Sequence, residues 1–133
     1  MNQERKTLLD EYVKMGISPI LLKDGSSFDF KNSVVINGNI NVEELNGHYE
    51  DVNFCPPTWY DELIKESENT YCVLVIENIN EIPLEEQPKF IEILKYRKIS
   101  TFDLPKNCII IATCTDLKDK KINEDVYSLL VEI

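Results

Sequence analysis

Two uninterrupted apolar runs constrain the fold of this chain more than any other feature of its sequence. The first, Cys72 to Ile76, ends at an acidic residue, and the second, Cys108 to Thr113, ends in small polar residues. Strands that are apolar without alternation are buried on both faces, which is typical of a parallel sheet covered by helices. Segments with helical spacing separate the strands, so the sequence predicts an α/β three-layer sandwich with a mostly parallel sheet.

Apolar periodicity, prolines and turn residues predict the remaining elements. Helices are expected over residues 3–15, 58–68, 82–98 and 122–131, with strands at 19–22 and 33–37 and a short strand or ribbon at 99–104. Gly16 ends the first helix, and Asp24-Gly25 is a strong signal for a hairpin turn. Thr58 is the expected N-cap of the second helix, and the third should become regular near Pro88. The polar segment 39–53 is predicted to be a loop with one helical turn.

The charge and the cysteines exclude several classes of partner and cofactor. Fourteen basic residues against 24 acidic ones give a net charge of −10, which opposes nucleic acids and anionic membranes because phosphate contacts require Lys or Arg. The four cysteines form no C-x-x-C pair and His48 is the only histidine, so the spacing predicts no metal site. Cys72 and Cys108 lie in apolar surroundings, which favours free thiols in a reducing compartment. We therefore expect a cytoplasmic protein, since no apolar run approaches the ~20 residues that cross a bilayer.

The order and spacing of four segments point to a family. The segments are 55–63 (CPPTWYDEL), 73–80 (VLVIENIN), 104–105 (LP) and 109–115 (IIIATCT). Together they resemble the core of the AAA+ ATPases of the MoxR-like group, over roughly Gly16 to the C-terminus. The resemblance implies a P-loop NTPase-like sheet whose carboxyl edge faces a bound nucleotide.

The resemblance also indicates which chemical groups have changed. The aspartate that helps to hold magnesium in the family falls on Glu77, and the glutamate that orients the attacking water falls on Asn78. An amide cannot take a proton from water, so hydrolysis lacks its base. The polar sensor residue falls on Thr115, a shorter hydroxyl, and no arginine finger is found near Ser128. The resemblance thus implies no catalytic residue and a vestigial site at Glu77, Asn78 and Thr115, although we favour Glu77 as a merely solvated carboxylate.

The phosphate-binding loop, the first helix and the helical lid of the family have no counterpart in the sequence. In the family the loop follows the first core strand and supplies backbone N–H groups and a lysine to the phosphates. Only eleven residues lie between Leu22 and Val34, too few for a loop of about eight residues and a helix of about twelve. They still suffice to span the ~25 Å between the strand ends. Residues 1–133 are therefore expected to form a single truncated AAA+-like domain without a nucleotide cofactor or a metal.

Three functional hypotheses follow from these observations. The first is a non-catalytic AAA+-like domain that acts through protein contacts as an accessory or regulatory subunit, with a complete AAA+ ATPase as one candidate partner, or that survives as a relic. The second is a residual nucleotide-binding protein or NTPase that a partner completes, with Glu77 holding magnesium. The third is an unrelated α/β domain that binds a small molecule. Trp59 and Tyr60 are candidate interface anchors, although we favour Trp59 as the cap of a small core beneath its helix.

Overall fold

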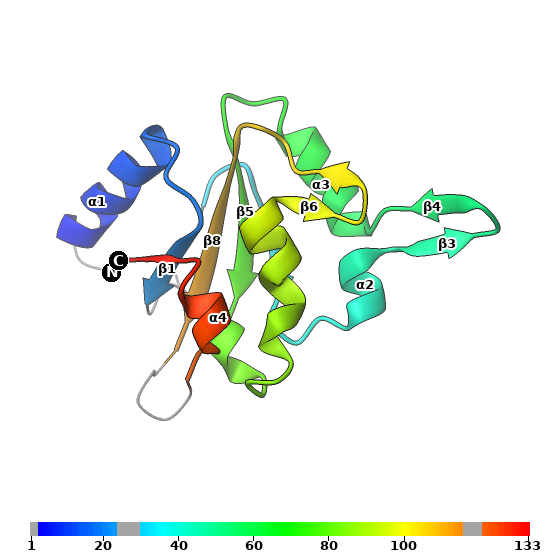
Figure 1. Ribbon diagram of the computed structural model, residues 1–133. Coiled ribbons are helices and arrows are strands. Elements are labelled where there is room, and N and C mark those ends of the chain that lie inside the picture. The colour runs from blue at the N-terminus through cyan, green and yellow to red at the C-terminus, as the bar shows by residue number, and fades with distance from the viewer. Residues whose placement is uncertain (1–2, 24–29, 116–120) are drawn as a thin grey trace.

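All strands of the central sheet run parallel. In the computed structural model, which describes residues 3–23, 30–115 and 121–133, the sheet has five strands in the order β2-β5-β8-β1-β9. Figure 1 labels three of them, β5, β8 and β1. They are β1 (Ile20–Lys23), β2 (Ser33–Asn37), β5 (Cys72–Glu77), β8 (Cys108–Cys114) and β9 (Val131–Glu132). The predicted α/β class with a parallel sheet is confirmed, and β9 is a strand that the sequence does not predict.

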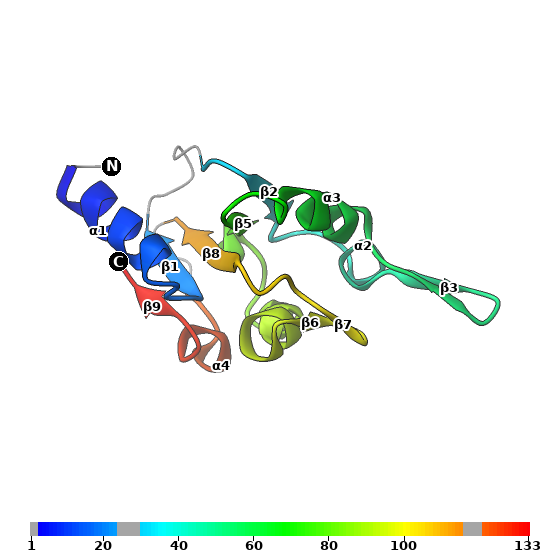
Figure 2. The same ribbon diagram turned by 90° about the horizontal axis from the view of Figure 1, so that it is seen from above.

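The inner strands send alternate side chains into two apolar clusters, one on each face of the sheet. From β5, Leu74 and Ile76 join one cluster, whereas Val73 and Val75 join the other. The larger cluster is covered by α3 (Thr58–Glu66), the 3₁₀ turn η2 (Gln87–Phe90), the π-helical turn η3 (Glu92–Tyr96) and α4 (Glu124–Tyr127), and the smaller by α1 (Gln3–Lys14). Figure 2 shows α1 and α4 on opposite sides of the edge formed by β1 and β9. The sheet is therefore the middle of three layers.

The first two helices lie close to their predicted ranges. α1 ends at Lys14, and Gly16 follows it with a φ of 71°, a left-handed conformation that glycine adopts without strain. α3 begins at Thr58, so the prediction that Thr58 is the N-cap is wrong. Pro57 takes that place in an extended conformation, and no side chain caps the helix. The main-chain oxygen of Pro57 instead accepts a hydrogen bond from the Tyr60 N–H at 3.0 Å.

The helix predicted over 82–98 is shorter and irregular. Its helical part, Gln87 to Tyr96, consists of η2 followed by η3, and a separate 3₁₀ turn, η1 (Ile79–Glu81), precedes it. Pro88 lies in the first turn, in agreement with the predicted start. A proline is tolerated there because the N–H groups of a first turn have no hydrogen-bond partner within the helix.

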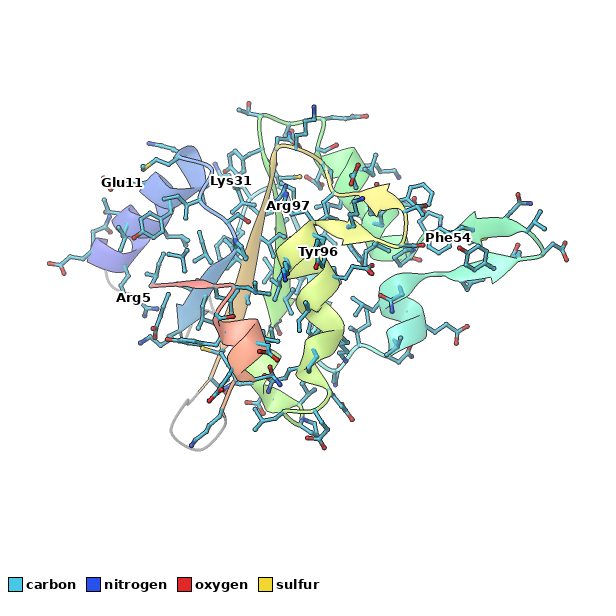
Figure 3. All side chains as sticks on the ribbon, in the orientation of Figure 1. Arg5, Glu11, Lys31, Phe54, Tyr96 and Arg97 are labelled. Atoms are coloured by element: carbon cyan, nitrogen blue, oxygen red, sulfur yellow. The ribbon has the colours of Figure 1, made fainter. Side chains whose placement is uncertain are left out.

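Arg97 ends this helix and ties it to the next strand. Its φ of 54° turns the chain into β6 (Lys98–Ile99), which pairs antiparallel with β7 (Phe102–Asp103) and confirms the ribbon predicted at this point. The guanidinium of Arg97, labelled in Figure 3, donates to the main-chain oxygens of Pro105 at 3.0 Å and Cys108 at 2.9 Å. One side chain therefore fixes both the end of η3 and the start of β8.

The prediction of a helix over 122–131 is wrong for its second half. α4 covers only four residues, after which the chain turns and forms β9 beside β1. The Val131 N–H donates to the Pro19 carbonyl and the Ile133 N–H to the Leu21 carbonyl, each at 2.9 Å. The edge of β1 offers these acceptors, and parallel pairing with it outweighs the helical periodicity of the segment.

The polar segment 39–53 contains the helical turn that the sequence predicts and a hairpin that it does not. The turn is α2 (Val42–Asn46), which begins after Asn41. The hairpin consists of β3 (His48–Glu50) and β4 (Asn53–Cys55), and it projects from the body of the molecule (Figure 1). Its composition is typical of a loop rather than of strands. The turn expected at Asp24-Gly25 lies outside the described residues.

Two further expectations concern the thiols and the membrane. None of the four cysteines, all of which lie in the described residues, forms a disulfide, and Cys72 and Cys108 are buried, as their apolar surroundings predict. Cys114 is buried as well. Across the described parts of the chain, helices lack the combination of length and apolar character that a bilayer crossing requires.

Gln87 is a buried polar residue that joins the irregular helix to the C-terminal segment. Its side chain is 0% exposed. The Nε2 atom donates to the main-chain oxygens of Ile82 at 3.1 Å and Lys121 at 3.0 Å, and Oε1 accepts from the Asn123 N–H at 2.7 Å. Because Asn123 caps α4, these bonds hold that helix against η2.

Replacing Gln87 by leucine should lower the free energy of unfolding by about 2–4 kcal/mol, because it leaves main-chain groups without partners in the core. Urea denaturation of the Gln87→Leu variant measures the loss. The neighbouring surface substitution Glu86→Leu is the matched control and should change stability by less than about 0.5 kcal/mol. Equal stabilities for the two variants would contradict the assignment.

Candidate functional site

The carboxyl ends of β5 and β8 lie side by side, as the parallel register requires. This edge is where the sequence places Glu77, Asn78 and Thr115, and the structure brings the segments that carry them together. The Asn78 N–H donates to the Thr113 hydroxyl at 3.0 Å, which links the end of β5 to the end of β8. The edge is therefore polar and internally bonded.

Thr115 is used to hold the turn that follows β5. Its N–H donates to Asn80 Oδ1 at 3.0 Å, and its hydroxyl donates to Glu81 Oε1 at 2.6 Å. Asn80 Nδ2 returns a bond of 3.4 Å to the Thr115 carbonyl, and the Asn80 side chain is buried. These contacts fasten η1 to β8. The sequence does not single out Asn80 or Glu81 as functional residues, although they lie only three and four positions after Glu77.

Glu77 and Asn78 close the end of β5 against β2. The main-chain oxygen of Glu77 accepts from the Gly38 N–H at 2.7 Å. A Cβ atom at Gly38 would lie 2.7 Å from the main-chain oxygen of Asn78, so only glycine allows this close approach. Asn78 has a left-handed backbone with a φ of 57°. Its Oδ1 atom is buried and has no hydrogen-bond partner among the described residues.

Three hydrogen-bond donors in the described part of this edge are already occupied by the protein. The N–H groups of Asn78 and Thr115 and the hydroxyl of Thr115 all bond to neighbouring side chains. A phosphate site needs such donors to point at the ligand. In the described part of the edge these three donors are therefore bonded within the protein and do not form a cradle for an anion.

Trp59 and Tyr60 lie in the core rather than on the surface. Their side chains are 5% and 7% exposed, and both belong to the larger apolar cluster. Trp59 Nε1 donates to the Leu45 carbonyl at 3.0 Å, and the Tyr60 hydroxyl donates to the Asp103 carbonyl at 2.6 Å. Burial raises the pKa of the Tyr60 phenol, with a smaller contribution from Asp103. Of the two alternatives for Trp59, an interface anchor or the cap of a small core beneath its helix, the sequence favours the second, and the observed burial agrees with it.

A cavity of about 720 Å³ lies between the end of β2, helix α2 and the start of α3. Its polar lining includes Asn39, Asn41, Glu43, Glu44, His48 and Glu62. Among the described residues, no lysine or arginine lines it. The cavity thus suits a cation or a hydrogen-bond donor better than a phosphate. The sequence gives little signal for it, because most of its polar groups come from the segment predicted to be a loop.

Comparison with known proteins adds no family: neither a protein-family model nor a curated protein sequence matches the chain. The geometry of the two polar regions is therefore the basis for a functional proposal. One region is the bonded edge of β5 and β8, and the other is the acidic cavity beside α2.

Replacing Asn78 by glycine should raise the free energy of unfolding by about 0.5–1 kcal/mol. Glycine adopts the left-handed conformation without a Cβ clash, and the substitution removes a buried oxygen that has no partner. Thermal or urea unfolding of Asn78→Gly measures the change. Asn32→Gly is the matched control: Asn32 has a φ of 55°, but its Nδ2 donates to the Tyr71 carbonyl at 3.2 Å, so no gain is expected there. Destabilisation by Asn78→Gly would show that the amide makes a necessary contact.

Proposed function

We propose that the chain is a non-catalytic, AAA+-like domain of the P-loop NTPase type that acts by contacting other proteins, as an accessory or regulatory subunit. The order of its strands supports this. In an AAA+ ATPase the acidic strand end, the sensor strand end and the phosphate loop must reach one nucleotide, so the strands that carry them have to be neighbours. Their counterparts here are β5, β8 and β1, which are adjacent in that order. Although β1 comes first in the chain, it lies between β8 and β9.

The absence of room for a phosphate-binding loop supports the proposal that the domain is non-catalytic. Nine residues separate Lys23, at the end of β1, from Ser33, at the start of β2. That length cannot hold a phosphate-binding loop and a helix of ordinary length. Among the described residues at the ends of β5 and β8, the N–H groups of Asn78 and Thr115 and the Thr115 hydroxyl are bonded to the protein itself. This single observation carries the proposal, because donors that are bonded within the fold stabilise it instead of binding phosphate.

One observation favours a rival function. Asn78 Oδ1 has no hydrogen-bond partner among the described residues, and Asn78 follows Glu77 in the chain. Amide and carboxylate oxygens are ligands that magnesium accepts. In this alternative the chain retains weak binding of a magnesium nucleotide, and a partner supplies the missing phosphate contacts.

Titration with MgATP and MgADP separates the two functions by thermal unfolding. For the non-catalytic domain the melting temperature should move by less than about 0.5 °C at 10 mM nucleotide. A dissociation constant near 100 µM would add about 2.7 kcal/mol under those conditions and raise the melting temperature by several degrees. Magnesium chloride alone is the control for ionic effects. A rise seen with the nucleotide and not with the salt would establish the rival.

The projecting hairpin is the surface that we propose for protein contacts. Tyr49 is 65% exposed and Val52, in the turn, is 90% exposed. Apolar side chains on a projection can be buried by a partner without rearrangement of the core.

A photo-crosslinking amino acid at position 52 should give a discrete adduct in extracts of the native cell. The same group at Lys106, an exposed position in the turn before β8, is the control and should give none. Adduct formation at both positions, or at neither, would contradict the proposed contact surface.

A further inference from the structure

The β3–β4 hairpin has two chemically different faces. Its register pairs His48 with Cys55, Tyr49 with Phe54 and Glu50 with Asn53. Paired residues of an antiparallel ladder share a face, and successive residues alternate between faces. One face therefore carries the two aromatic rings, and the other carries the imidazole, the carboxylate and the thiol of His48, Glu50 and Cys55.

The aromatic face fixes the hairpin to the body of the protein. Phe54 stacks on Phe102 with ring centroids 5.3 Å apart, and Tyr49 meets the edge of Phe54 at 5.2 Å. Tyr60 packs against Phe102 from α3, at 5.8 Å. Figure 3 labels Phe54 on this hairpin. Since a slip of one residue would exchange the two faces, these contacts also fix which residues face away from the aromatic rings.

The base of the hairpin is held tightly where His48 and Cys55 lie. Gly47 has a φ of 81°, and a Cβ atom there would lie 2.5 Å from the main-chain oxygen of Cys55. Only glycine allows the two chains to approach so closely. The Gly47 N–H also donates to the Glu43 carbonyl at 3.0 Å, so α2 leads directly into β3.

We propose that His48, Glu50 and Cys55 bind a zinc ion. His48 Nε2 lies 3.4 Å from Glu50 Oε1, and the three ligand atoms all lie within 4.8 Å of one another. Ligand atoms of a tetrahedral zinc site are roughly 3.3–3.8 Å apart, given bonds of about 2.0–2.3 Å. The histidine and glutamate are already at this separation, and binding requires the thiol of the half-buried Cys55 to reach it as well.

The chemical types of the three ligand atoms favour zinc over other metal ions. Nitrogen, sulfur and carboxylate oxygen together suit zinc, whereas calcium and magnesium prefer oxygen alone. Three protein ligands leave a fourth position for water or for a group from another molecule. His48 also lines the acidic cavity beside α2, so the ion would lie next to that cavity.

Cysteine accessibility distinguishes this site from the other thiols. Cys55 is half-buried, while Cys72, Cys108 and Cys114 are buried. A thiol has to lose its proton to bind a metal, and an apolar interior opposes the resulting charge. Cys55 is therefore the thiol that an added ion should reach.

Titration of the full chain with cobalt(II), a spectroscopic substitute for zinc, tests the proposal. One equivalent should bind and produce a thiolate-to-cobalt charge-transfer band, and zinc should displace it. Cys55→Ser should abolish the band, and His48→Ala should weaken binding on the order of 100-fold or more. Glu50→Gln should weaken it as well. Circular dichroism checks that each variant is folded.

Asp51→Asn is the matched control, because it removes one negative charge from the same hairpin without removing a ligand. It should bind cobalt like the unaltered chain. Binding without a charge-transfer band, a band that survives Cys55→Ser, or equal losses for Asp51→Asn and Glu50→Gln would each overturn the site. The outcome is independent of nucleotide binding, so it does not depend on the function proposed above.

Discussion

Burial of β5 and β8 on both faces is the constraint on which the rest of the structure depends. Every residue of β8 is buried, and so is every residue of β5 except its last. Strands of this kind require an apolar cover on each side, which α1 provides on one face and α3, η2, η3 and α4 on the other. The parallel arrangement then brings the carboxyl ends of the strands to one edge, where polar residues can follow without entering the core.

At that edge the same groups can either bind a ligand or bind one another. Thr115 bonds to both Asn80 and Glu81, and the Asn78 N–H donates to the Thr113 hydroxyl. Each bond joins a loop to a strand, so the edge contributes to stability. The contacts that we propose with other molecules accordingly lie elsewhere, on the β3–β4 hairpin.

The two halves of the candidate site differ in how far the sequence could predict them. Glu77, Asn78 and Thr115 follow apolar runs, so their common edge is predictable from strand direction. Their partners are not, because Asn80 reaches Thr115 only after β5 and β8 pair in one register. The zinc proposal departs from the expectation of no metal for a similar reason. His48 and Cys55 are seven positions apart in the sequence, and only the antiparallel pairing places them opposite each other.

The sequence by itself determined the elements that do not require a particular packing partner. These are the apolar strands β5 and β8, the amphipathic α1 and the turn at Gly16. Burial and periodicity suffice for these, since any apolar cover satisfies them. Tertiary structure decided the elements that need a particular backbone partner. The segment after α4 forms a strand because it pairs with the edge of β1. The β3–β4 hairpin is stabilised by the stacking of Phe54 on Phe102. These partners lie far away in the chain, so the secondary-structure propensity of a local segment cannot predict them.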